Sequence, residues 1–280
     1  MEKTFKIMIK PKSSWRDINF KELWAYRDLT MLFVKRSFIT RYKQTILGPA
    51  WLFITPIIST FISTFVFGTI AEIPSDGVPY FLFYMCGHTA WTYFSSNLIA
   101  TSSTFTGNAA IFGKVYFPRL VMPISTVITG LLNLFIQLGI FIGFWIYYHG
   151  IGAQIAFTWM VALFPILIVQ MAALSLGIGI IISSLTTKYR DLTVLVGFGV
   201  NLWMYITPII YSSSTLSSKL RAIVQLNPMT PVVDIMRCAF LGAGEVSWFY
   251  WGISWIVTVI VLMVGVVLFN RIEKTFMDTV

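Results

Sequence analysis

Polar and aromatic side chains recur at helical spacing in two apolar stretches of this 280-residue chain. They are Thr55, Ser59 and Ser63 in the first stretch and Phe198, Asn201 and Tyr205 in the second. Residues three or four positions apart lie on one face of a helix. Hydroxyl and amide groups hydrogen-bond sugar hydroxyls, and aromatic rings pack on sugar faces, so these residues are candidates for the wall of a path for a polyhydroxylated substrate. The same groups could instead join helices to one another.

The chain contains no complete motif for zinc-dependent hydrolysis or for nucleotide binding. No His-Glu-x-x-His sequence occurs. The nearest approach to a phosphate-binding loop runs from Gly107 to Lys114, but five residues separate its glycines and Val115 stands where a Mg²⁺-binding hydroxyl is required. We therefore expect no catalytic residue, metal site or cofactor in this chain. Any ATP and Mg²⁺ that drive it would bind a separate subunit.

The composition is that of an integral membrane protein. Hydrophobic residues make up 57% of the chain and charged residues 11%, against about a quarter charged in soluble domains. The mean hydropathy is +0.79. These values exclude a soluble enzyme and a disordered chain, and two cysteines are too few for a disulfide scaffold.

Six stretches without Asp, Glu, Lys or Arg are each long enough to cross a bilayer as a helix, which requires about 20 residues. They are residues 46–70, 80–104, 121–148, 155–185, 192–212 and 247–270. The sequence therefore predicts an all-α membrane domain of six transmembrane helices over residues 46–270.

The basic residues predict the orientation of these helices. Seventeen of the 20 Lys and Arg residues would lie on one side of the membrane if the N-terminus were cytoplasmic. That side comprises the N-terminal segment 1–45, loops 105–120 and 186–191, and the tail 271–280. Because basic residues accumulate on the cytoplasmic side, both termini are expected there. The net charge of +9 is thus explained without a nucleic-acid partner.

The N-terminal segment is predicted to contain an amphipathic helix that lies along the inner membrane surface. Its apolar face would comprise Phe20, Leu23, Trp24, Met31, Val34 and Phe38. Lys21 and Arg36 lie on the opposite face, and Arg27 interrupts the apolar one. A solvated arm is the alternative.

The outer segment 213–246 contains two helix-like runs, 217–226 and 231–241, that are too short to cross a bilayer. Asn227 and Pro228 separate them. Two short re-entrant helices, buried against protein, would satisfy their backbone groups. Leu220 and Val224 would supply the apolar surface of an outer gate, whereas a plain extracellular loop is the alternative.

All Asp, Glu, Lys and Arg residues fall in the loops under this topology. No ionisable pair is therefore expected inside the membrane, which disfavours transport driven by protons or sodium. His88, near the outer end of the second stretch, is expected to be a packing or interfacial residue.

Five short motifs occur in order along this topology. They are Arg41-Tyr42-Lys43-Gln44-Thr45-Ile46-Leu47-Gly48-Pro49-Ala50-Trp51 with Pro56, Phe117-Pro118-Arg119 with Pro123, Lys188-Tyr189-Arg190-Asp191-Leu192, Pro208-Ile209-Ile210-Tyr211, and Asn227-Pro228-Met229 with Arg237. In this respect the chain resembles the membrane (permease) subunits of bacterial polysaccharide ABC exporters of the ABC-2 type, which move O-antigen, capsule or teichoic-acid chains.

The resemblance implies a homodimer in the bacterial cytoplasmic membrane, bound to two copies of a soluble ATP-binding subunit. A lipid-linked polysaccharide would pass between the two halves, and the outer helices would close the exit. The resemblance also implies that the N-terminal helix and loop 105–120 meet the ATPase. The residues expected to transmit its stroke are Gly107, Asn108, Ala110, Phe112, Lys114 and Arg119.

Two other functions remain open at this point. An exporter of a drug or a small lipid would have the same architecture but a less polar path. A membrane-embedded acyl- or glycosyltransferase would need a His/Asp pair or an acidic metal site, and Asp28, Asp191 and Asp278 are isolated in the sequence.

Overall fold

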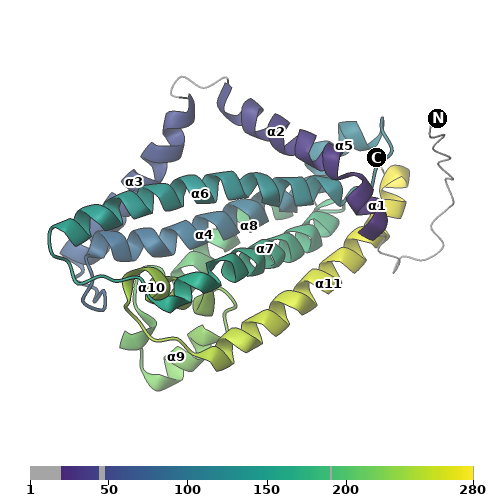
Figure 1. Ribbon diagram of the computed structural model, residues 1–280. Coiled ribbons are helices and arrows are strands. Elements are labelled where there is room, and N and C mark those ends of the chain that lie inside the picture. Colours follow the sequence, from purple (N-terminus) through teal and green to yellow (C-terminus); the bar gives the residue numbers. More distant parts are fainter. Residues whose placement is uncertain (1–19, 44–47, 190, 280) are drawn as a thin grey trace.

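The computed structural model describes residues 20–43, 48–189 and 191–279, and these residues form helices joined by short loops, with no strand among them. The all-helical prediction is confirmed for this part of the chain (Figure 1). Residues 1–19 of the predicted N-terminal segment, and residues 44–47 within the first motif, lie outside the described residues.

Four helical segments of the described chain are long and apolar enough to cross a membrane. The first, Trp51–Ile70, consists of α3 (Trp51–Ser63) and the π-helical turn η2 (Thr64–Ile70). The second is α6 (Val121–Gly150). The third, Trp159–Thr186, consists of η3 (Trp159–Leu163) and α7 (Phe164–Thr186). The fourth lies in α11 (Trp248–Thr279).

The other two predicted membrane stretches form helices that do not meet both criteria. Stretch 80–104 forms α4 (Tyr80–Ser102), which is long enough but carries many Ser, Thr and other polar residues. Stretch 192–212 forms α8 (Leu192–Ile206), which is apolar but only 15 residues long. Length and hydropathy thus identify four spans among the described residues rather than the six predicted.

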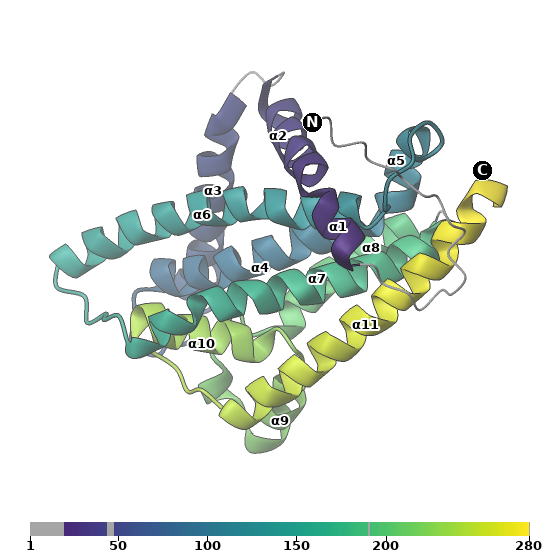
Figure 2. The same ribbon diagram turned by 45° about the vertical axis from the view of Figure 1, so that its right-hand side comes forward.

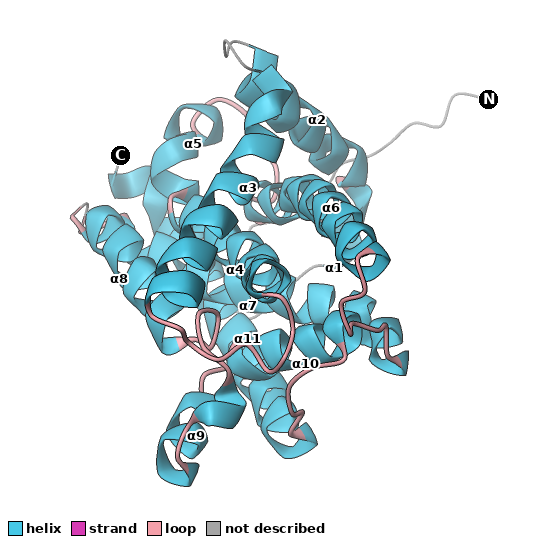
Figure 3. Cartoon of the chain, turned by 90° about the vertical axis from the view of Figure 1, so that its left-hand side faces the viewer, coloured by secondary structure: helices cyan, strands magenta, loops and turns pink. Residues whose placement is uncertain are grey.

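Helix α4 lies at the centre of the bundle. Viewed from the end that carries α9 and α10, α4 is surrounded by α3, α6, α7 and α8 (Figure 3). Most of its side chains are buried, and Leu82, Phe83, Tyr84 and Phe94 belong to the main hydrophobic core. Because α4 faces protein rather than lipid, its polar residues can be accommodated by hydrogen bonds inside the bundle.

A second, smaller core lies at the end of the bundle where α1 (Phe20–Ala25), α2 (Arg27–Lys43), α5 (Thr104–Phe112) and the last turns of α11 meet (Figures 1 and 2). It is made mainly of phenylalanine side chains: Phe33, Phe105, Phe112, Phe117 and Phe269. Charged segments distant in sequence are thus gathered at one end of the molecule.

The predicted apolar face of the N-terminal helix is only partly correct. A turn at Tyr26 separates α1 from α2. Val34 is buried and Leu23 packs against the small core, whereas Trp24 and Met31 are 71% and 62% exposed. The buried face of α2 is centred on Phe33 and Val34, and α2 packs against α6.

Much of loop 105–120 is helical. Only Ser103 separates the end of α4 from the start of α5 at Thr104, and Gly107 lies inside α5. Gly113 follows the last helical residue, and its N–H donates to the carbonyl of Ala109. Residues 117–120 are buried and lead directly into α6. The connection is therefore a compact unit fixed to the bundle.

The opposite end of the bundle carries η4 (Ser213–Thr215), α9 (Ser218–Gln225) and α10 (Thr230–Leu241). Helix α10 is buried against α4, α7 and η3, whereas most of α9 is exposed. Helix α10 ends at Gly242, whose φ of +70° is a left-handed conformation that favours glycine. The α9–α10 pair, residues 218–241, is called the outer hairpin below.

Candidate functional site, a polar cavity beside the central helix

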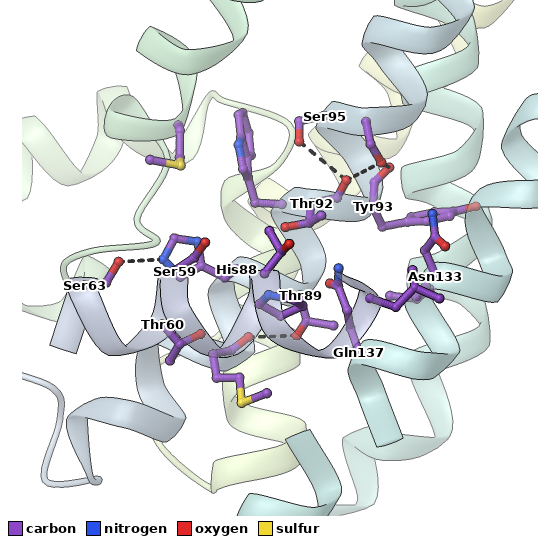
Figure 4. A pocket seen from close by; sticks show the side chains of 18 of the residues that line it. Ser59, Thr60, Ser63, His88, Thr89, Thr92, Tyr93, Ser95, Asn133 and Gln137 are labelled. Atoms are coloured by element: carbon purple, nitrogen blue, oxygen red, sulfur yellow. Dashed lines mark hydrogen bonds between the residues drawn. The ribbon is translucent and has the colours of Figure 1, made fainter. Parts of the chain in front are cut away.

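A cavity of about 640 Å³ lies between α3, α4, α6 and α8 and is partly open to the surroundings. Hydroxyl, amide and imidazole groups project into it from these helices (Figure 4). Its polar lining residues are Thr55, Ser59, Thr60, Ser63, His88, Thr89, Thr92, Ser95, Ser96, Asn133, Gln137 and Asn201. Trp51, Trp91 and Tyr93 add aromatic surface. The cavity therefore combines hydrogen-bonding groups with aromatic rings inside the predicted membrane domain.

Four of the six residues predicted to line a path do line this cavity: Thr55, Ser59, Ser63 and Asn201. Phe198 and Tyr205 do not belong to its lining, and their side chains are 63% and 56% exposed. Helix α8 lies at the edge of the bundle with only Val200 buried, so most of its surface has no contact within the subunit. Helical spacing placed the three α8 residues together but could not indicate which face of α8 meets the cavity.

Several lining residues were not among the predicted path residues. Asn133 and Gln137 lie on α6, four residues apart, and both line the cavity. Their spacing within an apolar stretch is the sequence signal that could have identified them. His88 on α4 also lines the cavity, and its Nε2 atom lies 2.9 Å from the Oγ atom of Ser63 on α3, so it joins the two helices.

Two ionisable residues of the predicted outer segment, Asp234 and Arg237, are buried within the protein at the outer hairpin. Arg237 is 2% exposed, and its guanidinium lies 3.7 Å from the centroid of the Phe83 ring. It donates hydrogen bonds to the carbonyls of Ile209 (2.6 Å) and Tyr211 (3.2 Å). The signal in the sequence was Asp234 and Arg237 three residues apart, on one face of a short apolar helix.

Asp234 lies on the same helix as Arg237 and is also buried. Its Oδ2 atom accepts hydrogen bonds from Ser213 Oγ at 3.0 Å and from Gln225 Nε2 at 2.9 Å. Burial raises the pKa of Asp234 to about 6, although the charge of Arg237 opposes this shift. Asp234 thus joins α9, α10 and the chain before α9.

Asp76 binds the segment between α8 and α9 from the side opposite Asp234. It accepts hydrogen bonds from Ser212 and, at 2.7 Å, from Ser214, while Ser213 between them points to Asp234. The segment from α8 to α9 is therefore fixed between two carboxylates.

The four predicted gate residues occupy two different environments. Leu220 is 54% exposed and Val224 is partly buried on α9. Asn227, at the bend, accepts a hydrogen bond from Trp203 Nε1 at 3.1 Å and donates one to Thr207 Oγ1 at 2.8 Å. The carbonyl of Pro228 accepts a hydrogen bond from Ser254 at 2.6 Å. The bend is thus attached to α8 and α11, whereas the apolar side chains of α9 are accessible.

The predicted coupling residues also separate into two groups. Gly107, Ala110 and Lys114 are exposed, and Asn108 is partly exposed. Phe112 and Arg119 are buried, with the guanidinium of Arg119 5.3 Å from the centroid of the Phe112 ring. Only the first group can touch a partner directly. The exposed side chains of Val115 and Tyr116, which are not among the predicted coupling residues, extend the accessible surface.

No group of three or more His, Cys, Asp or Glu side chains that could hold a metal ion occurs in the described part of the chain. The polar groups of the cavity are neutral hydroxyls and amides, together with His88. Such a lining suits hydrogen bonding to an uncharged polar molecule.

Comparison with known proteins agrees with the resemblance found in the sequence. Residues 28–241 match the family described as ABC-2 type transporter. An O-antigen export system permease protein RfbA of Klebsiella pneumoniae is 29% identical over 251 residues, which are 90% of this chain and 94% of the relative. A Myxococcus xanthus protein of the same name is 28% identical over 79% of this chain and 83% of its own length. The chain belongs to the ABC-2 type transporter family.

Proposed function

We propose that this chain is the permease subunit of an ATP-driven exporter that moves a lipid-linked polysaccharide of the O-antigen type across the cytoplasmic membrane. The observation that carries the proposal is the polar cavity beside α4, in a chain whose relatives are named O-antigen export permeases. Hydroxyl and amide groups inside a membrane domain require polar partners, and a sugar chain supplies them. A path for a drug or small lipid would favour an apolar lining.

The proposed topology has six crossings with both termini in the cytoplasm. Helix α4 has 23 residues, which correspond to about 35 Å, and most of its polar side chains line the cavity or are buried in the bundle. Aromatic side chains cluster where α6 ends and where η3 and α11 begin, as is typical of a membrane interface. The end that carries α1 and α5 would then be cytoplasmic.

The proposed assembly is a homodimer with two copies of a soluble ATP-binding subunit. Large apolar side chains of α8 are exposed, including Val194, Leu195 and Phe198. The cavity is also partly open to its surroundings. A second copy of the chain would cover both the exposed side chains of α8 and the opening of the cavity. The path would then lie between the two subunits.

Export of the glycan tests the proposal directly. The chain and its ATPase would be reconstituted in liposomes with a labelled lipid-linked glycan. Replacing Asn133 and Gln137 with leucine should reduce ATP-dependent export about tenfold, because each hydrogen bond lost to the sugar costs about 0.5–1.5 kcal/mol. Phe135→Leu, an exposed position on the same helix, is the matched control.

Equal export by the double variant and the control would contradict the role of the cavity. ATP-dependent transport of a hydrophobic dye, with no transport of the glycan, would favour a drug or lipid exporter instead.

The outer hairpin is proposed to close the exit of the path at rest. Leu220→Asn combined with Val224→Asn should raise the ion conductance of liposomes without ATP, because a dry apolar constriction would then admit water. Lys219→Gln, on the exposed surface of the same helix, should leave the conductance at its original level. If the hairpin merely covers the bundle, the double variant would be less stable on heating but would not leak.

A further inference from the structure

Helix α11 is in contact with both regions proposed to move during transport. It runs along α7 from the outer hairpin to the end that carries α5 (Figures 1 and 2). Besides apolar packing, it makes specific hydrogen bonds and ring contacts at each end.

At the end that carries α5, Arg119 joins the connection between α5 and α6 to α11. Its Nη1 atom donates to the carbonyl of Glu273 at 2.8 Å, and its backbone N–H donates to the Glu273 carboxylate at 3.4 Å. The rings of Phe105 and Phe269 stack nearby with centroids 4.4 Å apart. Displacement of the α5–α6 connection would therefore displace the end of α11.

In the middle of the bundle, α7 and α11 are in backbone contact. A Cβ atom added at Gly265 would lie 2.6 Å from the carbonyl oxygen of Gly177. A Cβ atom added at Gly177 would lie 2.9 Å from the backbone of Leu262. Small residues that allow such close approach produce tight helix pairs in membranes, so α7 and α11 are expected to move as one body.

At the outer end, a chain of hydrogen bonds joins this helix pair to the hairpin bend. Trp251 Nε1 donates to Gln170 Oε1 at 2.9 Å, and Gln170 Nε2 donates to Ser254 Oγ at 2.6 Å. Ser254 Oγ in turn donates to the carbonyl of Pro228 at 2.6 Å. These residues are buried or partly buried, so water cannot readily replace a hydrogen-bond partner that a substitution removes.

We propose that the α7–α11 pair is a rigid strut that transmits motion of loop 105–120 to the outer hairpin, with Arg119 and Ser254 as the positioning residues at its two ends. About 28 Å of helix separates Glu273 from Ser254. Neither positioning residue belongs to the cavity lining. The inference rests on the proposed function, in which the ATPase moves loop 105–120 and the hairpin closes the exit.

The test measures movement of the hairpin rather than transport. A cysteine introduced at the exposed position Lys219 would be labelled with a membrane-impermeant maleimide in the reconstituted complex, with and without ATP, against the same complex lacking that cysteine. ATP should change the labelling rate in the parent complex. Ser254→Ala should abolish this change while ATP hydrolysis by the complex continues, and Arg119→Gln should abolish it as well.

Thr258→Ala is the matched control, because the Thr258 hydroxyl donates only to the carbonyl of Ser254 in the same helix. It should preserve the response to ATP. Intact ATP hydrolysis and co-purification with the ATPase show that the variants are folded.

A full response in Ser254→Ala would overturn the strut, as would a parent complex whose hairpin does not respond to ATP. These outcomes differ from failure of the proposed function, since the labelling experiment contains no glycan. A complex that responds to ATP but exports no glycan would contradict the substrate assignment and leave the strut supported.

Discussion

Replacement of Arg237 by alanine is expected to destabilise the protein by about 3–5 kcal/mol, the range measured when one member of a buried charged group is removed. The substitution removes two hydrogen bonds to the carbonyls of Ile209 and Tyr211 and the contact with Phe83. It also leaves Asp234 buried without the positive charge of its neighbour. Heating the purified protein in detergent and measuring the folded fraction would show the loss as a lower unfolding temperature.

Arg221 provides the matched control for this measurement. Its ion pair with Glu245 is short, at 2.6 Å, but the Glu245 side chain is 66% exposed. Exposed ion pairs contribute about 0–1 kcal/mol, so Arg221→Ala should change stability little. Adding Asp234→Asn to Arg237→Ala should restore part of the stability, because the unpaired carboxylate is then neutral. Equal losses of stability in Arg237→Ala and Arg221→Ala would contradict the larger contribution expected of the buried residue.

Ala110→Asp is expected to abolish export. Ala110 is exposed on α5, within the surface proposed to meet the ATPase. Burying an unpaired carboxylate in that contact should cost several kcal/mol, and about 1.4 kcal/mol corresponds to a tenfold change in an equilibrium. Glycan export and ATP hydrolysis would be measured in parallel in the reconstituted complex, and hydrolysis should no longer drive export.

Ala110→Ser is the control for this prediction, because serine adds one small uncharged group at the same exposed position. It should export at the parent rate. Undiminished export by Ala110→Asp would refute the placement of the ATPase on α5. An exposed contact residue should tolerate a small uncharged substitution. Loss of export in Ala110→Ser as well would therefore contradict the proposed contact.

The sequence by itself determined the class of the protein. Long apolar stretches, few charges and basic residues concentrated in a few loops are properties of the linear chain, and they predict membrane helices without knowledge of their packing. The order of short motifs such as Phe117-Pro118-Arg119 indicated the family to which the chain belongs. Helical spacing also placed Thr55, Ser59 and Ser63 on one face of α3, and all three line the cavity.

The tertiary structure decided what surrounds each side chain. Asp234 and Arg237 belong to the predicted outer segment, but only the structure shows their partners. Arg237 contacts Phe83 and the carbonyl of Ile209, and Asp234 accepts a hydrogen bond from Gln225. Spacing and residue type predict that Phe198 and Tyr205 line the path, but only the structure shows that both side chains are exposed and lie outside the cavity of one subunit. Periodicity shows that residues share a helical face, whereas the neighbour of that face depends on segments far away in the sequence. Arg119 and Glu273, 154 residues apart, meet only because α11 returns along the whole bundle.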